Sequence, residues 1–187
     1  MNLAPSAAAV PANPRKQRLM EEIEQGLDEA ERWRKINAAY HEDDHKFMRF
    51  LIPPGKRVLE IGCGTGELLA ALEPAYGVGI DFGAKTLARA RARFPGLNFI
   101  LGDAEDRATL QAIEGPFDYI VIADTIGMWE DIDATLRLIY QLCTPSTRIV
   151  IAYYSHLWEP VLKTAEALGC AASSRPSTTS PRPTFSI

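Results

Sequence analysis

A glycine-rich turn at residues 62–66 narrows the choice of fold more than any other part of this chain. Gly62, Gly64 and Gly66 alternate with other residues, after an apolar run that contains Glu60 and before a leucine-rich segment. This order predicts a buried strand, a tight turn and then a helix. Glycine is needed where φ is positive or where a Cβ atom would collide with a ligand, and the first N–H groups of the helix point into the same crevice. The turn therefore predicts a ligand site built from main chain at the end of a parallel sheet.

The spacing of these glycines separates two kinds of ligand. The dinucleotide fingerprint G-x-G-x-x-G requires a third glycine five residues after the first. That position is Glu67, whose bulk and negative charge disfavour a pyrophosphate. The phosphate-binding loop G-x-x-x-x-G-K-[ST] is not matched either, because no lysine follows any of these glycines.

The remaining pattern, Glu-x-Gly-x-Gly-x-Gly from Glu60 to Gly66, resembles motif I of the class I S-adenosylmethionine-dependent methyltransferases. The resemblance implies a Rossmann-like fold and S-adenosylmethionine as the cofactor. It also implies that Glu60 holds the amino group of the cofactor, directly or through water. A glycine-rich strand-to-helix turn without a ligand is the alternative interpretation.

Acidic residues follow the next two expected strands. Asp81 lies twenty residues after Ile61, a spacing that in a βαβ unit places a carboxylate beside the ribose of an adenosine ligand. The resemblance implies that Asp81 binds the ribose, that Phe82 lies against the adenine, and that Asp103 accepts a hydrogen bond from the exocyclic amine. Asp103 could also be the N-cap of a following helix, and the two roles can coexist. The expected cofactor-binding residues are Glu60, Gly62, Cys63, Gly64, Gly66, Asp81, Phe82, Asp103, Ala104 and Ala123.

Strands and helices alternate along most of the chain. Strands are expected at residues 58–61, 76–80, 98–101, 117–123 and 148–153, and helices at residues 68–72, 85–93, 109–113 and 132–142. This alternation predicts an α/β fold, a three-layer Rossmann-like parallel sheet with helices on both faces. The continuous apolar runs suit strands that are covered on both sides.

The carboxyl end departs from the family pattern, in which two more strands follow the fifth as an antiparallel hairpin. One helix is expected at residues 158–168, and Ser, Thr and Pro then supply eleven of the seventeen residues 171–187. That composition does not build buried strands. We expect five strands and a disordered tail, in a truncated or frame-shifted relative or in a natural short form. The fifth strand then has an apolar edge through which a homodimer could form.

The region before the glycine turn is expected to be helical. Residues 1–14 are rich in alanine and proline and are expected to be a disordered tail. From Arg15 a helix is expected whose apolar face is Leu19, Ile23, Leu27 and Ala30. We expect residues 15–52 to form a helical lid over the cofactor and acceptor, with Trp33, Tyr40 and His41 available to line it. Packing against the helices of the sheet is the alternative. Residues 53–170 are the expected cofactor-binding domain.

The residues that would act on an acceptor are less clearly marked. A sulfonium methyl group is a strong electrophile, so the protein need only hold a nucleophile in line at about 3 Å. A general base is required only where the acceptor is poorly ionised. Asp124, after the fourth strand, is the expected catalytic residue. The alternative for each candidate is a residue that packs at a strand end or lies on the surface. The other candidates are Trp129, Tyr153, Tyr154 and His156.

A zinc-protease pattern, H-E-x-x-H, occurs from His41 to His45. A catalytic zinc site needs a third protein ligand, and the sequence offers no evident one. We expect a solvated, charged helix end and no metal.

Composition restricts the function classes further. The net charge of −4 disfavours general nucleic-acid binding, and no apolar run approaches the length of about 20 residues that spans a membrane. Cys63, Cys143 and Cys170 form no C-x-x-C pair, so reduced thiols in the cytoplasm are expected. Three classes of function remain for this chain. They are a methyltransferase acting on a small-molecule, lipid or glycan acceptor, a cofactor-binding protein with impaired turnover, and an NAD-binding oxidoreductase.

Overall fold

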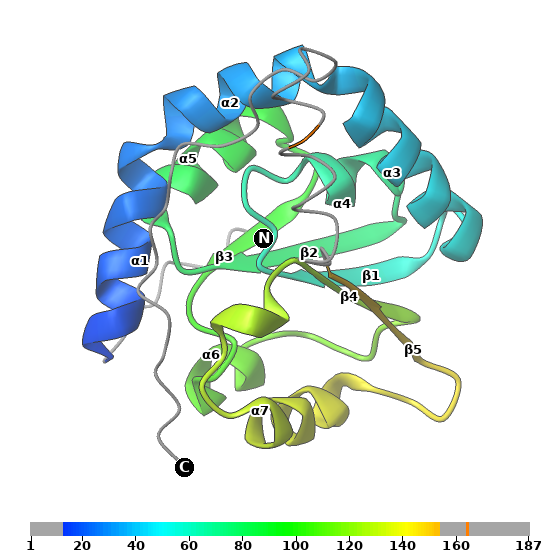
Figure 1. Ribbon diagram of the computed structural model, residues 1–187. Coiled ribbons are helices and arrows are strands. Elements are labelled where there is room, and N and C mark those ends of the chain that lie inside the picture. The colour runs from blue at the N-terminus through cyan, green and yellow to red at the C-terminus, as the bar shows by residue number, and fades with distance from the viewer. Residues whose placement is uncertain (1–12, 154–163, 165–187) are drawn as a thin grey trace. The chain divides into compact units, whose positions relative to one another are not determined.

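A parallel sheet of five strands forms the centre of the fold (Figure 1). The computed structural model of the chain describes residues 13–153 and residue 164. The strands are β1 (Arg57–Ile61), β2 (Tyr76–Asp81), β3 (Asn98–Leu101), β4 (Tyr119–Ala123) and β5 (Arg148–Ala152). Their order is β3-β2-β1-β4-β5 and every pair is parallel. The order reverses between β1 and β4, which is where ligands bind in sheets of this kind.

Helices cover both faces of this sheet, so the predicted three-layer α/β architecture is confirmed. The helices that follow the strands are α4 (Glu67–Ala71), α5 (Ala84–Arg93), α6 (Arg107–Gln111) and α7 (Ile132–Ile139), with 3-10 turns η1 (Ile126–Met128) and η2 (Tyr140–Leu142). Successive side chains of a strand point to opposite faces. In β4, Ile120 and Ile122 therefore pack toward α6 and α7, whereas Val121 packs toward α4 and α5.

The amino-terminal region forms three helices, α1 (Pro14–Gln25), α2 (Leu27–Ile36) and α3 (Ala38–Leu51). The prediction of one helix running from Arg15 through Ala30 is wrong, because the helix is interrupted at Gly26 (φ −85°, ψ 2°). Glycine disfavours a helix interior by about 1 kcal/mol relative to alanine, and that cost is avoided when two helices meet there. Leu27 is buried after the break and Ala30 is exposed.

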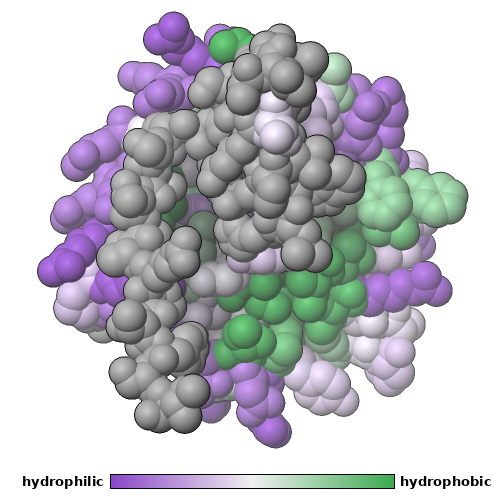
Figure 2. All heavy atoms as spheres, in the orientation of Figure 1, coloured by the Kyte–Doolittle hydropathy of each residue, from purple (hydrophilic) through white to green (hydrophobic). Residues whose placement is uncertain are grey.

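The strand β5 lies at one edge of the sheet within the described part of the chain. Its side chains Ile149 and Ile151 are 42% and 48% exposed, and hydrophobic side chains gather on this side of the molecule in Figure 2. Residues 1–12 of the predicted amino-terminal tail, the predicted carboxyl-terminal tail and most of the helix expected at residues 158–168 lie outside the described residues. The amino-terminal tail was predicted to extend to residue 14, but Pro14 already begins α1 and Asn13 caps it. Among the described residues, no helix has both the length and the apolar character needed to cross a membrane.

Candidate functional site

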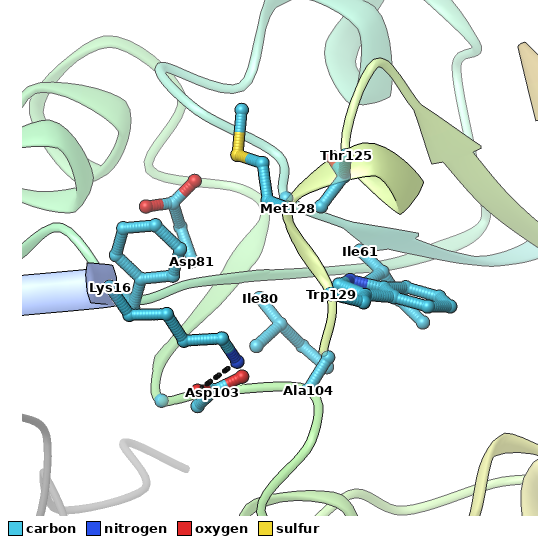
Figure 3. Close-up of a pocket in the computed structure, with 12 residues that line it drawn as sticks. Lys16, Ile61, Ile80, Asp81, Asp103, Ala104, Thr125, Met128 and Trp129 are labelled. Atoms are coloured by element: carbon cyan, nitrogen blue, oxygen red, sulfur yellow. Dashed lines mark hydrogen bonds and ion pairs between the residues drawn. The ribbon is translucent and has the colours of Figure 1, made fainter. Parts of the chain in front are cut away.

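A pocket lies at the carboxyl ends of β1, β2, β3 and β4 (Figure 3). The residues that line it are Lys16, Ile61, Gly62, Ile80, Asp81, Phe82, Gly102, Asp103, Ala104, Thr125, Met128 and Trp129. The space between them is about 20 Å³. A single water molecule needs about 10–15 Å³ on this measure, so the pocket is almost filled by the chain's own side chains.

The structure brings half of the predicted cofactor-binding residues to this pocket. Gly62, Asp81, Phe82, Asp103 and Ala104 all line it. The other five do not line it, and they are Glu60, Cys63, Gly64, Gly66 and Ala123. Sequence reasoning did not predict a pocket role for Lys16 of α1, but it did name Trp129, which lines the pocket, among the candidates for acting on an acceptor.

The glycine turn has positive φ at all three glycines, and two of them are required by close packing. A Cβ atom on Gly62 would lie 2.1 Å from Oγ1 of Thr125, and one on Gly66 would lie 2.8 Å from the Phe99 ring. A Cβ atom on Gly64 would meet nothing within 4 Å. Thr125 and Phe99 therefore leave no room for a side chain at positions 62 and 66. Gly64 is the glycine of this turn at which a ligand could approach the main chain.

Asp81 holds the glycine turn through its side chain. Its Oδ2 accepts a hydrogen bond from the Gly64 N–H at 3.0 Å, and its Oδ1 accepts one from the Gly83 N–H at 2.8 Å. Burial raises the pKa of Asp81, although these N–H groups oppose the shift. A carboxylate oxygen can accept a second hydrogen bond, so both oxygens retain capacity for a ribose diol.

Asp103 lies after β3 and contacts two groups. Its Oδ1 accepts the Glu105 N–H at 3.0 Å, and its Oδ2 lies 2.5 Å from Nζ of Lys16. The alternative role of Asp103 as a helix N-cap is wrong, because a turn separates it from α6. The N-cap is Asp106, whose side chain accepts hydrogen bonds from the first free N–H groups of that helix.

Glu105 is a structural residue of the site that sequence reasoning missed. Its carboxylate accepts the N–H groups of Glu130 and Asp131, each at 2.9 Å, and pairs with Lys16. Burial alone would raise the pKa of Glu105, but the Asp131 N–H and Lys16 lower it below the usual value. Glu105 thus joins the loop after β3 to the loop after β4. An acid two residues beyond Asp103 was the only sequence signal.

Lys16 carries the positive charge that these acids surround. Its side chain comes from α1, and the residue is only 4% exposed. Burial lowers the pKa of Lys16, but the hydrogen bonds to Asp103 and Glu105 outweigh burial and raise the pKa above its usual value. The ammonium group therefore stays charged at neutral pH.

Glu60 lies at the end of β1, beneath the glycine turn, and is 3% exposed. Its Oε2 has no hydrogen-bond partner among the described residues. Burial raises the pKa of Glu60 to about 8, against a smaller opposing effect of the Leu69 N–H. The side chain is therefore largely protonated at pH 7 and has one oxygen available for another polar group.

Glu67, which occupies the third-glycine position of the dinucleotide fingerprint, does not line the pocket. Its carboxylate binds Arg34 at 2.8 Å, Arg93 at 2.5 Å and the Thr65 hydroxyl at 2.5 Å. Burial opposes ionisation of Glu67, but the Thr65 hydrogen bond and the Arg34 charge lower its pKa below the usual value. The acid connects the glycine turn to α2 and α5.

Asp124, the predicted catalytic residue, is exposed at the end of β4 and adopts a left-handed backbone conformation (φ +53°). Such a conformation costs a non-glycine residue of order 1 kcal/mol, and it occurs often near functional sites. Trp129 is buried in the pocket wall, whereas Tyr153 is 54% exposed. Tyr154 and His156 lie outside the described residues.

The H-E-x-x-H segment forms part of α3. Within residues 13–153 and 164, no three His, Cys, Asp or Glu side chains come together as a metal site. Burial, followed by the Arg34 charge, lowers the pKa of His41. Of the cysteines in the described part, Cys63 and Cys143 are both free thiols.

Residues 52–177 match a protein-family profile described as a methyltransferase domain. The chain belongs to this family, the class I S-adenosylmethionine-dependent methyltransferases. Arsenite methyltransferase of Aquipseudomonas alcaligenes is 34% identical over 118 residues, covering 56% of this chain and 33% of that protein. The 2-phytyl-1,4-naphtoquinone methyltransferase of Thermosynechococcus vestitus is 33% identical over 113 residues, covering 56% and 49%. The methyltransferase domain thus spans a half or less of these curated relatives.

Solved structures agree on the fold. A SAM-dependent methyltransferase from Thermotoga maritima superimposes with a TM-score of 0.64 and 23% identity, covering 78% of this chain and 68% of that one. An amino pentose methyltransferase from Micromonospora echinaspora, whose structure holds bound SAM, gives a TM-score of 0.52 and 21% identity, covering 69% and 56%. The cofactor of the methyltransferase domain is S-adenosylmethionine.

The residues of the site fit this cofactor chemically. Asp81 and Asp103 offer acceptors at the ends of adjacent strands, Gly64 leaves main chain approachable, and Glu60 has a buried oxygen that no described residue pairs with. The free space of about 20 Å³ between these residues is smaller than that of pockets that hold ligands of this size, which is about 300 Å³ or more.

Proposed function

We propose that this domain transfers a methyl group from S-adenosylmethionine to a small-molecule, lipid or glycan acceptor. The observation that carries the proposal is the convergence on one pocket of Gly62, Asp81 and Asp103, from the ends of three adjacent parallel strands. This is the switch-point crevice at which ligands bind in doubly wound sheets.

Each polar group of the site has a proposed role in holding the cofactor, which supplies an activated methyl group when bound. Asp81 would accept the ribose hydroxyls, Asp103 would accept the adenine amine, and Glu60 would hold the amino group directly or through water. The remaining chemistry is the alignment of an acceptor and the exclusion of water. Asp124 is the proposed group for orienting or deprotonating an acceptor, which its exposure at the end of β4 supports.

The proposed acceptor class rests on the names of the relatives and on the net charge of the chain. The relatives carry names that specify arsenite and a naphtoquinone as acceptors, and both are small molecules or lipids. The net charge of −4 makes a nucleic-acid acceptor the less favoured class. A cofactor-binding protein with impaired turnover is the second candidate.

Two measurements test the proposal. Calorimetry with S-adenosylhomocysteine and with NADH should detect binding of the first ligand only, and the reverse result would assign the domain to the oxidoreductases. Transfer of label from methyl-labelled S-adenosylmethionine into fractions of a cell extract then separates an active enzyme from an impaired one. Asp124→Asn should retain S-adenosylhomocysteine binding and lose labelled product. Unchanged labelling would remove Asp124 from the site.

We further propose that β5 pairs with a second copy of the chain. The exposure of Ile149 and Ile151 on an edge strand supports this, because an open apolar edge favours pairing. Sedimentation velocity should show a dimer that Ile151→Lys dissociates. A monomer at all concentrations would refute the dimer.

A further inference from the structure

We infer that Lys16 is a latch that holds α1 closed over the pocket and competes with the cofactor for Asp103. The inference rests on the proposed function, because it concerns the same cofactor site. It assigns α1 and α2, residues 14–36, to a lid that opens when the cofactor enters.

The first observation is the position of the Lys16 side chain. It extends from α1 into the pocket, and its Nζ lies 2.5 Å from Oδ2 of Asp103 (Figure 3). The same ammonium pairs with Glu105. The residue is 4% exposed although it belongs to the first turn of a terminal helix. A lysine is rarely buried so fully unless it is paired.

The second observation is that Lys16 occupies the place at which the adenine amine would approach Asp103. Both groups donate hydrogen bonds, and the Lys16 ammonium already lies 2.5 Å from Oδ2 of Asp103. The pocket that contains Lys16 has only about 20 Å³ of free space. The cofactor and the closed position of Lys16 therefore exclude each other.

The third observation is the way in which the lid is attached. Ion pairs join it to α5 and α4, namely Glu24 with Lys85, Asp28 and Glu31 with Arg89, and Arg34 with Glu67. Leu27 is the only apolar residue of α1 and α2 that is buried. These ion pairs are partly exposed, so each stabilises the attachment modestly and is weakened in part by salt. Leu19, Met20, Ile23 and Trp33 are half-buried, so lifting the lid would expose Leu27 and part of the surface of these four side chains.

The attachment also connects the lid to both walls of the pocket. Lys16 contacts Glu105, which holds the Glu130 and Asp131 N–H groups of the loop after β4. Asn13 donates a hydrogen bond to the Glu130 side chain. Withdrawal of Lys16 would thus release α1 from the joined loops after β3 and β4, and the volume that its side chain leaves would become available to an adenosine group.

The competition is tested by titrating S-adenosylhomocysteine into the full chain and three variants. Lys16→Ala should lower the dissociation constant about 3- to 10-fold, because the binding-competent open form becomes more populated. Lys16→Arg restores the charge and should return the constant toward that of the wild type. Lys35→Ala, at an exposed lysine of α2, is the matched control and should change nothing. Weaker or unchanged binding by Lys16→Ala would overturn the competition.

The latch itself is tested without any cofactor by amide hydrogen exchange. Exchange of the amides in residues 14–36 should be about tenfold faster in Lys16→Ala than in the wild type at 50 mM NaCl, and most of this difference should persist near 500 mM NaCl, because salt screens the buried Lys16 pair only weakly. Equal exchange at low salt would overturn the latch. If no protein binds S-adenosylhomocysteine, the proposed function and the competition both fail, whereas the exchange result still decides whether Lys16 holds the lid.

Discussion

The Asp81 carboxylate accepts a hydrogen bond from the Gly64 N–H across 3.0 Å, joining the end of β2 to the glycine turn after β1. The residue proposed to bind the ribose therefore also sets the shape of the turn beside it. Its second oxygen holds the Gly83 N–H at the start of α5. Loss of this side chain should affect the cofactor and the local fold together.

Asp81→Ala should weaken S-adenosylhomocysteine binding by about 1–3 kcal/mol, since charged hydrogen bonds to the ribose would be lost. It should also lower the free energy of unfolding, because two N–H groups lose their acceptor. Calorimetry and urea unfolding measure the two effects separately. Asp133→Ala, which removes an exposed acid, is the control and should leave both unchanged. Wild-type affinity in Asp81→Ala would remove Asp81 from the site.

Gly62→Ala should destabilise the domain by about 2–5 kcal/mol. A left-handed φ costs alanine roughly 1–2 kcal/mol, and overpacking against Thr125 adds about 1–3 kcal/mol. Gly96→Ala is the matched control, because a Cβ atom there meets nothing within 4 Å. Urea unfolding should place Gly96→Ala near the wild type. Equal stability of the two variants would contradict the close contact between Gly62 and Thr125.

Glu60→Gln should change how stability depends on pH. Burial raises the folded pKa of Glu60 from the ordinary 4.5 to about 8, so the folded state holds more protons than the unfolded state between these values. Glu60 therefore favours the fold at the acidic end of this window, and that contribution is lost as the pH rises toward 8, at no more than about 1.4 kcal/mol per pH unit.

Urea unfolding at several values between pH 5 and pH 8 tests this effect. The free energy of unfolding of the wild type should fall relative to that of Glu60→Gln across the series. His41 and Asp81 are present in both proteins, so their titration cancels in the difference. Parallel curves would show that Glu60 titrates normally in the folded state.

Ile122→Ala should lower the free energy of unfolding by about 2–5 kcal/mol, since its side chain is fully buried in the centre of the sheet. Ile132→Ala provides the comparison, because Ile132 is 45% exposed at the start of α7. The change there should be about 0.5 kcal/mol or less. Thermal unfolding of both variants measures the contrast, and similar losses would contradict the burial of the β4 core.

Much of the architecture could be predicted from local pattern. The apolar strand 98–101 has the bounds of β3, and Gly62, Asp81 and Asp103 were predicted to meet because carboxyl ends of parallel strands share one edge of a sheet. Gly26 is unfavourable in a helix interior, but its weak helix propensity alone could not show that the chain would break there.

The amino-acid sequence by itself determined the sheet, the glycine turn and the acids after the strands, because strand periodicity and turn chemistry are local properties. Tertiary structure alone decided that Lys16 reaches Asp103, that Thr125 explains the glycine at position 62, and that Glu67 turns toward Arg34 and Arg93. These contacts join residues that are 26 to 87 positions apart. Such pairings depend on how helices dock on the sheet, and no local pattern specifies that docking.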